Sequence, residues 1–281
     1  MAASTSAASG TSIPRAEVLR ARAHIIRSIR EWFWGSGFLE VEAPTLVRSP
    51  AMEEHLEAFR VGERFLHTSP EFALKRVLAA GLPRIFSLGP CYRDEEWGPL
   101  HGHEFTMLEW YRVGCGYEGI ASDLVGLLGA LGIPEPVRVT VREAFVAVGG
   151  RPEDPIEAQR TWVNDVEQRF QRPTLVFDYP ADEAALSELR GEHAERFELY
   201  WKGVELANAF TELRDPTELL ERWAKNNARR RAAGRAPHPV DARLVEAVAR
   251  HPRAGGIALG IDRLVMLLLG EDDIERVRVC G

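Results

Sequence analysis

Cysteine and long apolar runs are scarce in this sequence of 281 residues. The three cysteines, Cys91, Cys115 and Cys280, are odd in number and lack the spacing of a metal site, so we expect reduced thiols rather than a disulfide framework. No apolar run approaches the roughly 18 residues that span a membrane, and the N-terminal residues lack the basic and apolar regions of a signal peptide. These absences predict a soluble, cytoplasmic protein with no membrane partner.

Positive charge is also limited. The chain has 42 acidic and 35 basic residues, which gives a net charge of −7, and lysine occurs only at positions 75, 202 and 225. This balance is not typical of a broad nucleic-acid surface, so we expect no stable binding of tRNA. The hydrophobic content of 45% is enough for a substantial core.

The first twelve residues are rich in Ala, Ser and Thr, and we predict a disordered tail over 1–12. Residues 13–281 contain no internal repeat or low-complexity linker, which predicts one folded domain. Ser12 and Pro14 are suited to begin a helix that ends near Gly35. Several predicted strands follow one another without a helix between them. This order favours an α+β fold, with an antiparallel sheet flanked by helices, over a doubly wound sheet.

Apolar periodicity predicts the individual elements. The first helix carries one apolar stripe, made of Val18, Ile25, Ile29 and Trp32. Strands are predicted at Phe38–Val41, Arg64–His67, Arg84–Leu88, Phe105–Val113, Thr174–Phe177, Phe197–Trp201 and Gly256–Gly260. Further helices are predicted at Pro70–Ala80, Gly119–Leu131, Pro155–Phe170, Pro216–Ala233, Asp241–Ala249 and Ile261–Leu269.

The segment Cys91–Tyr111 joins two strand-like stretches through a polar, glycine-containing loop. Period-two alternation predicts that Arg93 and Glu95 share one face of the leading strand. A face rich in charged and aromatic side chains is unusual for a core and fits a ligand site; the alternative is a solvated outer face with scattered aromatic residues. The trailing strand places four side chains on one face: Phe105, Met107, Glu109 and Tyr111.

A second cluster of polar residues lies between positions 205 and 212. Asn208, Phe210 and Glu212 alternate onto one face of a strand, whereas Glu205 would point the other way. If both glutamates serve one site, the strand must bend or bulge between them. Paired carboxylates suit Mg²⁺ or an ammonium group; the alternative is two unrelated surface acids.

A third segment, Gly255–Leu269, reads as a strand of small residues that enters a helix, with Arg263 in the first helical turn. The glycines would let a nucleotide approach the backbone, and Arg263 could stack on a base or contact a phosphate.

Together these segments resemble the signature motifs of the class II aminoacyl-tRNA synthetases. The hairpin Arg93–Tyr111 is similar to motif 2, and Gly256–Leu269 is similar to motif 3. The lysyl branch of the family is indicated by Thr68–Glu71, Glu104–Tyr111 and Glu205–Leu213. The resemblance extends over about residues 14–281, and it implies a class II catalytic domain for this part of the chain.

Motif 1 of the family, a dimer-interface element, is resembled by Gly37–Pro44 after the long helix. The resemblance therefore implies a homodimer. We expect its two-fold interface to bury the strand Phe38–Pro44 and the apolar stripe of the first helix.

Within the lysyl branch, the sequence is similar to paralogues that aminoacylate a protein, the elongation factor P–(R)-β-lysine ligases. Lysyl-tRNA synthetases carry an anticodon-binding domain before motif 1, where this chain has a short tail. Ala258 stands where their motif 3 has Gly, and Glu109–Arg112 and Asn227–Asp241 are similar to the ligases. The resemblance implies an enzyme that uses ATP and Mg²⁺ to activate (R)-β-lysine, a lysine-type amino acid, as an acyl-adenylate. The acceptor would be a lysine of elongation factor P.

The resemblance also implies a role for each motif residue. Arg93 and Arg263 would be catalytic, because they would offset charge at the α-phosphate. Glu95 would lie near the adenine ring, with Phe105 and Arg263 on either side of that ring. The implied ATP-binding set is Arg93, Asp94, Glu95, His101, Gly102, Phe105, Glu205, Leu206, Gly260 and Arg263.

The amino-acid pocket and the metal site are implied in the same way. Glu205 and Glu212 would hold Mg²⁺. A doubly cationic substrate requires several carboxylates in a desolvated pocket, and the implied set supplies them. That set is Ser69, Pro70, Glu71, Glu109, Tyr111, Asn208, Phe210, Glu212 and Ala258.

Some features depart from the family or have a second interpretation. Gly102 and His103 stand where the family has Asn-Pro, which removes a side-chain contact to ATP, and the segment between about 115 and 195 is shorter. The run Arg229–Arg231 is typical of a solvated helix face; the alternative is docking of an acidic acceptor. For the whole chain, the alternatives are a minimal enzyme that charges RNA and a non-catalytic binding paralogue.

Overall fold

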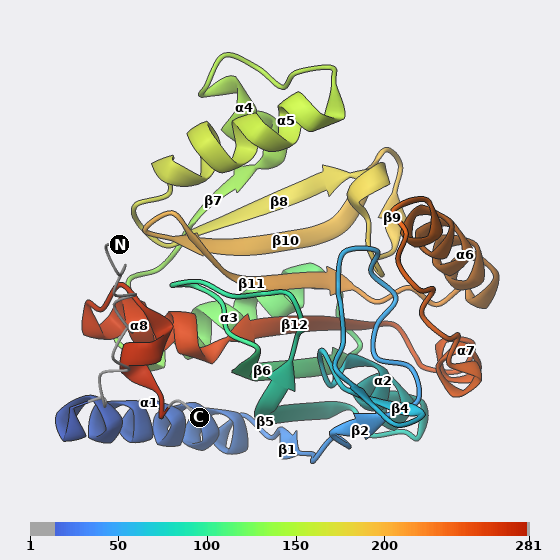
Figure 1. Ribbon diagram of the computed structural model, residues 1–281. Helices are drawn as coiled ribbons and strands as arrows, with labels where there is room; N and C mark the ends of the chain where they lie inside the picture. Colours follow the sequence, from blue (N-terminus) through green and yellow to red (C-terminus); the bar gives the residue numbers. More distant parts are fainter. Residues whose placement is uncertain (1–14, 280–281) are drawn as a thin grey trace, which may run out of the picture.

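A nine-stranded sheet runs through the middle of the computed structural model, which describes residues 15–279 (Figure 1). In spatial order its strands are β1 (Leu39–Glu40), β5 (Arg84–Tyr92), β6 (Glu104–Val113), β12 (Ala254–Gly260), β11 (Val204–Thr211), β10 (His193–Trp201), β8 (Thr174–Pro180) and β7 (Val137–Thr140), with β9 (Leu189–Arg190) paired to β10. Only β1 with β5 and β7 with β8 are parallel among these described pairs. The predicted antiparallel sheet is therefore confirmed. The predicted tail, Ser12 and Pro14 lie outside the described residues.

Three helices, α1 (Ala16–Gly35), α3 (Tyr117–Ala130) and α8 (Ile261–Leu269), pack against one face of this sheet (Figure 1). The side chains between them form the largest core, in which Phe33 of α1 stacks on Phe86 with ring centroids 4.6 Å apart. The apolar stripe of α1 was expected in a dimer interface. It packs on this core instead: Ile29 is fully buried, and the other three stripe residues contact the same cluster. Burial within its own chain therefore accounts for the periodicity of α1.

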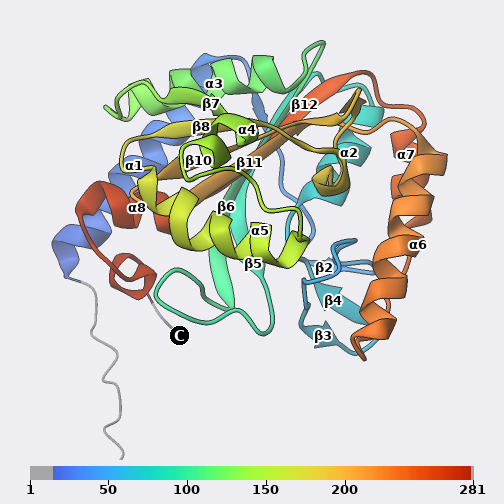
Figure 2. The ribbon, with the colours of Figure 1, turned by 90° about the horizontal axis from the view of Figure 1, so that it is seen from above.

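The remaining elements surround the opposite face and the two ends of the sheet. Figure 2 shows α6 (Pro216–Ala232) and α7 (Ala242–Val248) at one end, beside α2 (Glu71–Ala79) and a small sheet of β2 (Leu46–Val47), β4 (Arg64–Leu66) and β3 (Arg60–Val61). At the other end, α4 (Val141–Val146) packs on β8, and α5 (Pro155–Thr161) follows it in the chain. Short helical turns complete the fold: Trp162–Val166 (π), Glu167–Arg169, Ala181–Glu183 and Ile274–Val277 (3₁₀).

Two predicted elements end earlier than expected. The helix predicted over 155–170 is α-helical only to Thr161 and then changes to π and 3₁₀ turns. The strand that was to place Arg93 beside Glu95 ends at Tyr92. The chain turns there, because the backbone N–H of Glu95 donates to Asp94 Oδ1 (3.0 Å) and Glu95 has a left-handed φ of 67°. None of the described helices is long and apolar enough to cross a membrane.

Strand β11 contains the irregularity that its sequence predicted. Its pairing with β10 shifts register: Leu199 lies opposite Ala207, but the next residue, Tyr200, lies opposite Glu205. One residue of β11 is therefore extra, as in a β-bulge. The bulge turns Glu205 onto the half-buried face that also carries Asn208 and Phe210.

Candidate functional site

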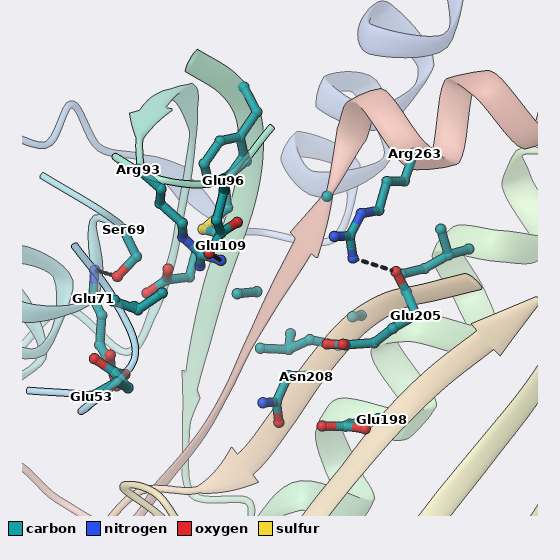
Figure 3. Close-up of a pocket in the computed structure, with 18 of the residues that line it drawn as sticks. Glu53, Ser69, Glu71, Arg93, Glu96, Glu109, Glu198, Glu205, Asn208 and Arg263 are labelled. Atoms are coloured by element: carbon teal, nitrogen blue, oxygen red, sulfur yellow. Dashed lines mark hydrogen bonds and ion pairs between the residues drawn. The ribbon is translucent and has the colours of Figure 1, made fainter. Parts of the chain in front are cut away.

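A cavity of about 620 Å³ lies on the face of the sheet opposite α1, α3 and α8. Its floor is formed by β6, β12 and β11, whose alternate residues point into it. On β12, for example, Ile257 and Leu259 belong to the core, whereas Ala258 and Gly260 line the cavity. The walls come from α2, the segment 53–56 and the loop 96–102 (Figure 3).

One end of the cavity is acidic and buried. Glu109 and Glu212 are 2% and 0% exposed. The hydroxyl of Tyr111 donates to Glu109 Oε1 at 2.6 Å, and Lys75 Nζ lies 2.6 Å from Glu212 Oε2. The other oxygen of each carboxylate, Glu109 Oε2 and Glu212 Oε1, has no hydrogen-bond donor in the described chain. Each buried acceptor without a donor costs about 1–3 kcal/mol, so this end of the cavity is suited to a ligand that brings N–H groups.

Burial and mutual repulsion disfavour ionisation of these carboxyl groups. Burial is the main cause that raises the pKa of Glu109 well above its usual value, and repulsion by Glu71 adds to it. Burial likewise raises the pKa of Glu212 to about 7, although Lys75 opposes the shift. A cationic ligand would favour the ionised forms.

The floor beneath this acidic end requires a glycine. Gly256 of β12 lies between Tyr111 of β6 and Phe210 of β11 in the cross-strand register. A Cβ atom at Gly256 would lie 2.2 Å from Glu212 Oε1 and 2.4 Å from Tyr111 Cε1. The small residue therefore leaves the space that the carboxylate and the phenol ring occupy.

The other end of the cavity carries two arginines. The Arg93 guanidinium lies over the Phe105 ring, 5.1 Å from its centroid, and its Nε is buried without an acceptor in the described chain. Arg263, in the first turn of α8, donates to the carbonyls of Leu100 (3.0 Å) and Glu205 (2.9 Å). It thereby fixes the loop 96–102 to β11, and Arg93 and Arg263 together provide positive charge for an anionic ligand.

A pair of carboxylates lies between these arginines and the outer strands. Glu205 faces the cavity, and its carboxylate accepts no hydrogen bond from the described residues. Glu198 of β10 accepts from Tyr179, Tyr200 and Arg196. Burial, then repulsion by Glu198, raises the pKa of Glu205 to about 7. One or two carboxylates are the usual protein contribution to Mg²⁺ bound with nucleotide phosphates, so this pair fits that ion.

The wall segment 53–57 is held in place by one buried arginine. Arg230 of α6 is 2% exposed, and its guanidinium donates to the carbonyls of Glu54 (3.0 Å) and Leu56 (2.8 Å) and to Glu57 Oε1 (2.8 Å). The Glu57 carbonyl accepts in turn from the backbone N–H of Asp94 (2.9 Å). The contacts of Arg230 therefore extend from α6 to the residue beside Arg93.

Comparison with known proteins agrees with this geometry. Residues 12–280 match the family of tRNA synthetases class II (D, K and N). The chain is 38% identical to the elongation factor P–(R)-β-lysine ligase of Vibrio cholerae, with 92% of this chain and 93% of the relative aligned. It is 36% identical to the ligase of the same name in Vibrio parahaemolyticus, with 93% and 94% aligned. The chain belongs to the class II tRNA synthetases, in the group of these ligases. The resemblance of the three motifs is thus confirmed.

The structure brings most of the predicted site residues of this family together around the cavity. Three lie elsewhere. Pro70 caps the start of α2, Asp94 pairs with the segment 53–57 through its backbone, and the exposed Glu95 forms an ion pair with Arg235 (3.2 Å). The predicted residues that do line the cavity are Ser69, Glu71, Arg93, His101, Gly102, Phe105, Glu109, Tyr111, Glu205, Leu206, Asn208, Phe210, Glu212, Ala258, Gly260 and Arg263.

The structure does not bring together the predicted metal pair of Glu205 and Glu212. The bulge does place both on one face of β11. However, seven residues of strand at about 3.3 Å each, less the extra residue of the bulge, put their Cα atoms roughly 20 Å apart. The carboxylate oxygens that share one ion must each lie within about 2–2.6 Å of it.

Sequence reasoning missed Glu96, Glu198 and Lys75. Glu96 takes the place expected for Glu95, because the chain turns after Tyr92. Glu198 could have been found, since it alternates with Tyr200 on a predicted strand. Lys75 lies one helical turn after Glu71, which was also visible.

Arg230 was expected on a solvated helix face, and its burial yields a test against its neighbour. Arg230→Met removes the donors to the carbonyls of Glu54, Leu56 and Ala236 and to the Glu57 carboxylate, so we expect a loss of about 3 kcal/mol in the free energy of unfolding. Arg229→Met is the matched control: Arg229 is half-exposed and, among the described residues, pairs only with Glu54 (2.9 Å), so its loss should cost under about 1 kcal/mol. Urea denaturation measures both. Equal losses would contradict the anchoring role of Arg230.

Proposed function

We propose that this protein activates (R)-β-lysine with ATP as an acyl-adenylate and transfers it to a lysine of elongation factor P. Residues 13–281 form the catalytic unit, and it works in the cytoplasm, where its acceptor serves translation. The relatives named for this reaction support the proposal. So does one observation on the cavity itself: in the described chain, Glu109 and Glu212 present unpaired buried acceptors at one end, and Arg93 presents an unpaired buried donor at the other.

This polarity orients an amino acid with two amino groups. The ammonium groups bind toward Glu71, Glu109 and Glu212, and the carboxylate points toward Arg93. ATP lies at the arginine end, with its α-phosphate near Arg93 and its adenine near Phe105 and Arg263. Glu198 and Glu205 would hold Mg²⁺, which would add positive charge beside the phosphates.

The reaction takes place in two steps. A carboxylate oxygen of the amino acid attacks the α-phosphorus, and pyrophosphate leaves. Arg93 and Arg263 offset the negative charge that develops on the phosphate, and the fixed floor of the cavity positions the reactants. The neutral amine of the acceptor lysine then attacks the acyl carbon, AMP leaves, and an amide bond forms.

Labelled amino acid tests the proposal directly. The enzyme is incubated with ATP and radiolabelled (R)-β-lysine or α-lysine, with either elongation factor P or tRNA as acceptor. We expect label from (R)-β-lysine on elongation factor P, and a more than tenfold lower rate in Glu212→Gln, which keeps the shape of the side chain but loses its charge. Label on tRNA alone would support the RNA-charging alternative instead.

Ala258 is proposed to select the position of the amino group. It lies on β12 between Glu109 and Asn208, so its methyl group points into the amino-acid pocket. We expect Ala258→Gly to increase kcat/KM for α-lysine tens to hundreds of times more than for β-lysine, because one methyl group changes discrimination by about 1–3 kcal/mol. Pyrophosphate exchange with both amino acids measures this. An unchanged ratio would assign the selection to the pocket acids.

We also propose a homodimer, through a surface different from the stripe predicted on α1. Trp34 and Leu39 are 54% and 52% exposed, and β1 is an edge strand of the main sheet. Such an edge and its exposed apolar side chains suit a two-fold contact. Light scattering should give twice the 31.4 kDa of one chain. Trp34→Glu should shift the mass toward one chain, whereas Val146→Glu, at an even more exposed apolar site on α4 (67%), should not. A monomeric wild type would refute the proposal.

A further inference from the structure

Lys75 is a buried cation inside the acidic end of the cavity. It lies in the second turn of α2, and its side chain is 2% exposed. Its Nζ is 2.7 Å from Glu71 Oε1 and 2.6 Å from Glu212 Oε2, and it lies 5.5 Å from the centroid of the Phe210 ring. The ammonium group thus joins α2 to the end of β11.

A lysine in such a place would ordinarily lose its proton. Burial acts to lower the pKa of Lys75, but the carboxylates of Glu212 and Glu71 outweigh it and raise the pKa above the usual value. Lys75 therefore stays charged at any pH at which the protein is folded and these carboxylates are ionised.

The charges around Lys75 do not balance within the protein. Three carboxylates at this end are buried, those of Glu71, Glu109 and Glu212, and Lys75 compensates one of them. When all three are ionised, as a bound cationic ligand favours, two negative charges are left, which equals the two ammonium groups of a diamino acid. The other titratable and charged groups that face this cluster are Glu53 on the wall segment, Tyr111 on β6, Glu188 before β9, Arg214 after β11 and His251 before β12.

We propose that Lys75 is a positioning residue whose fixed charge keeps Glu71 and Glu212 ionised and sets the pocket to accept two ammonium groups. The inference rests on the proposed function. Without the cation, three carboxylates would share one buried site, and one that is ionised in the wild type would also take up a proton at neutral pH. That protonated group would then bind an ammonium poorly, and a diamino acid would be held by one group fewer.

The test is the pH profile of amino-acid activation. Pyrophosphate exchange with (R)-β-lysine is measured from pH 6 to 9 in the wild type, in Lys75→Met and in Lys75→Arg. The pKa of Glu212 is about 7, so wild-type kcat/KM should fall as the pH drops through 7, because protonation removes an ammonium acceptor. Lys75 lowers that pKa, so its removal should move the midpoint up by at least one pH unit. At pH 7 the KM for the amino acid should then be at least tenfold higher in Lys75→Met, and it should recover toward pH 9.

Two controls separate charge from shape. Lys75→Arg keeps the charge and should keep the midpoint near that of the wild type. The KM for ATP should change less than threefold in both variants, since Lys75 lies at the opposite end of the cavity from Arg93. The double variant Lys75→Met/Glu71→Gln removes one charge of each sign, so its midpoint should return to within half a unit of the wild type. The double variant also tests the proposal if Lys75→Met does not fold.

The outcomes distinguish this inference from the function on which it rests. A wild type that exchanges pyrophosphate with no diamino acid would remove the proposed function. If the wild type exchanges pyrophosphate with a diamino acid but Lys75→Met loses activity equally at every pH, the proposed role of Lys75 alone is overturned. Lys75 would then be a packing residue. The proposed role of Lys75 is also overturned if the double variant keeps the shifted midpoint of Lys75→Met.

Discussion

The arrangement of this site follows from one constraint: several carboxylates are buried in a single cavity, where ionisation is disfavoured. Two like charges about 4 Å apart repel by about 4 kcal/mol at an effective dielectric constant near 20. The chain offsets this repulsion by placing a donor against each acid, Lys75 between Glu71 and Glu212 and Tyr111 against Glu109. These donors satisfy only part of each carboxylate. The oxygens left over determine where a cationic ligand can bind.

The sheet makes that selective pairing possible because it fixes the positions of its side chains. Cross-strand register places Glu109, Ala258 and Asn208 in one row across β6, β12 and β11. The opposite face of the same strands is packed against α1, α3 and α8. A shift of one residue would move every cavity side chain into this core, so the packing on one face specifies the chemistry of the other.

Much of this fold could be predicted from the sequence, because it depends on local periodicity. Alternation along β6 and β11 identified side chains that face the cavity, and apolar spacing gave α8 to the residue. Side-chain alternation along β11 also predicted a bend or bulge between Glu205 and Glu212 if both glutamates serve one site, and a bulge follows Glu205. What could not be predicted depends on local backbone turns and on contacts between distant segments. The turn at Glu95 and the pairing of Lys75 with Glu212 are examples, since neither leaves a repeating pattern in the chain.

The cost of leaving buried groups unpaired explains why arginine side chains hydrogen-bond to the walls of the cavity. Glu109 Oε2, Glu212 Oε1 and Arg93 Nε each lack a partner in the described chain, and at about 1–3 kcal/mol apiece they oppose folding by an amount comparable with the stability of many domains. A cavity with such groups would tend to collapse or to admit water unless its walls were held apart. Arg230 of α6 holds the wall segment, and Arg263 of α8 holds the loop 96–102 against β11. Each does so through at least two hydrogen bonds to backbone carbonyls. Their contacts stabilise segments that contribute no regular structure of their own. The binding groups therefore remain unpaired in the folded protein, and a ligand of matching charge recovers the energy that their burial costs.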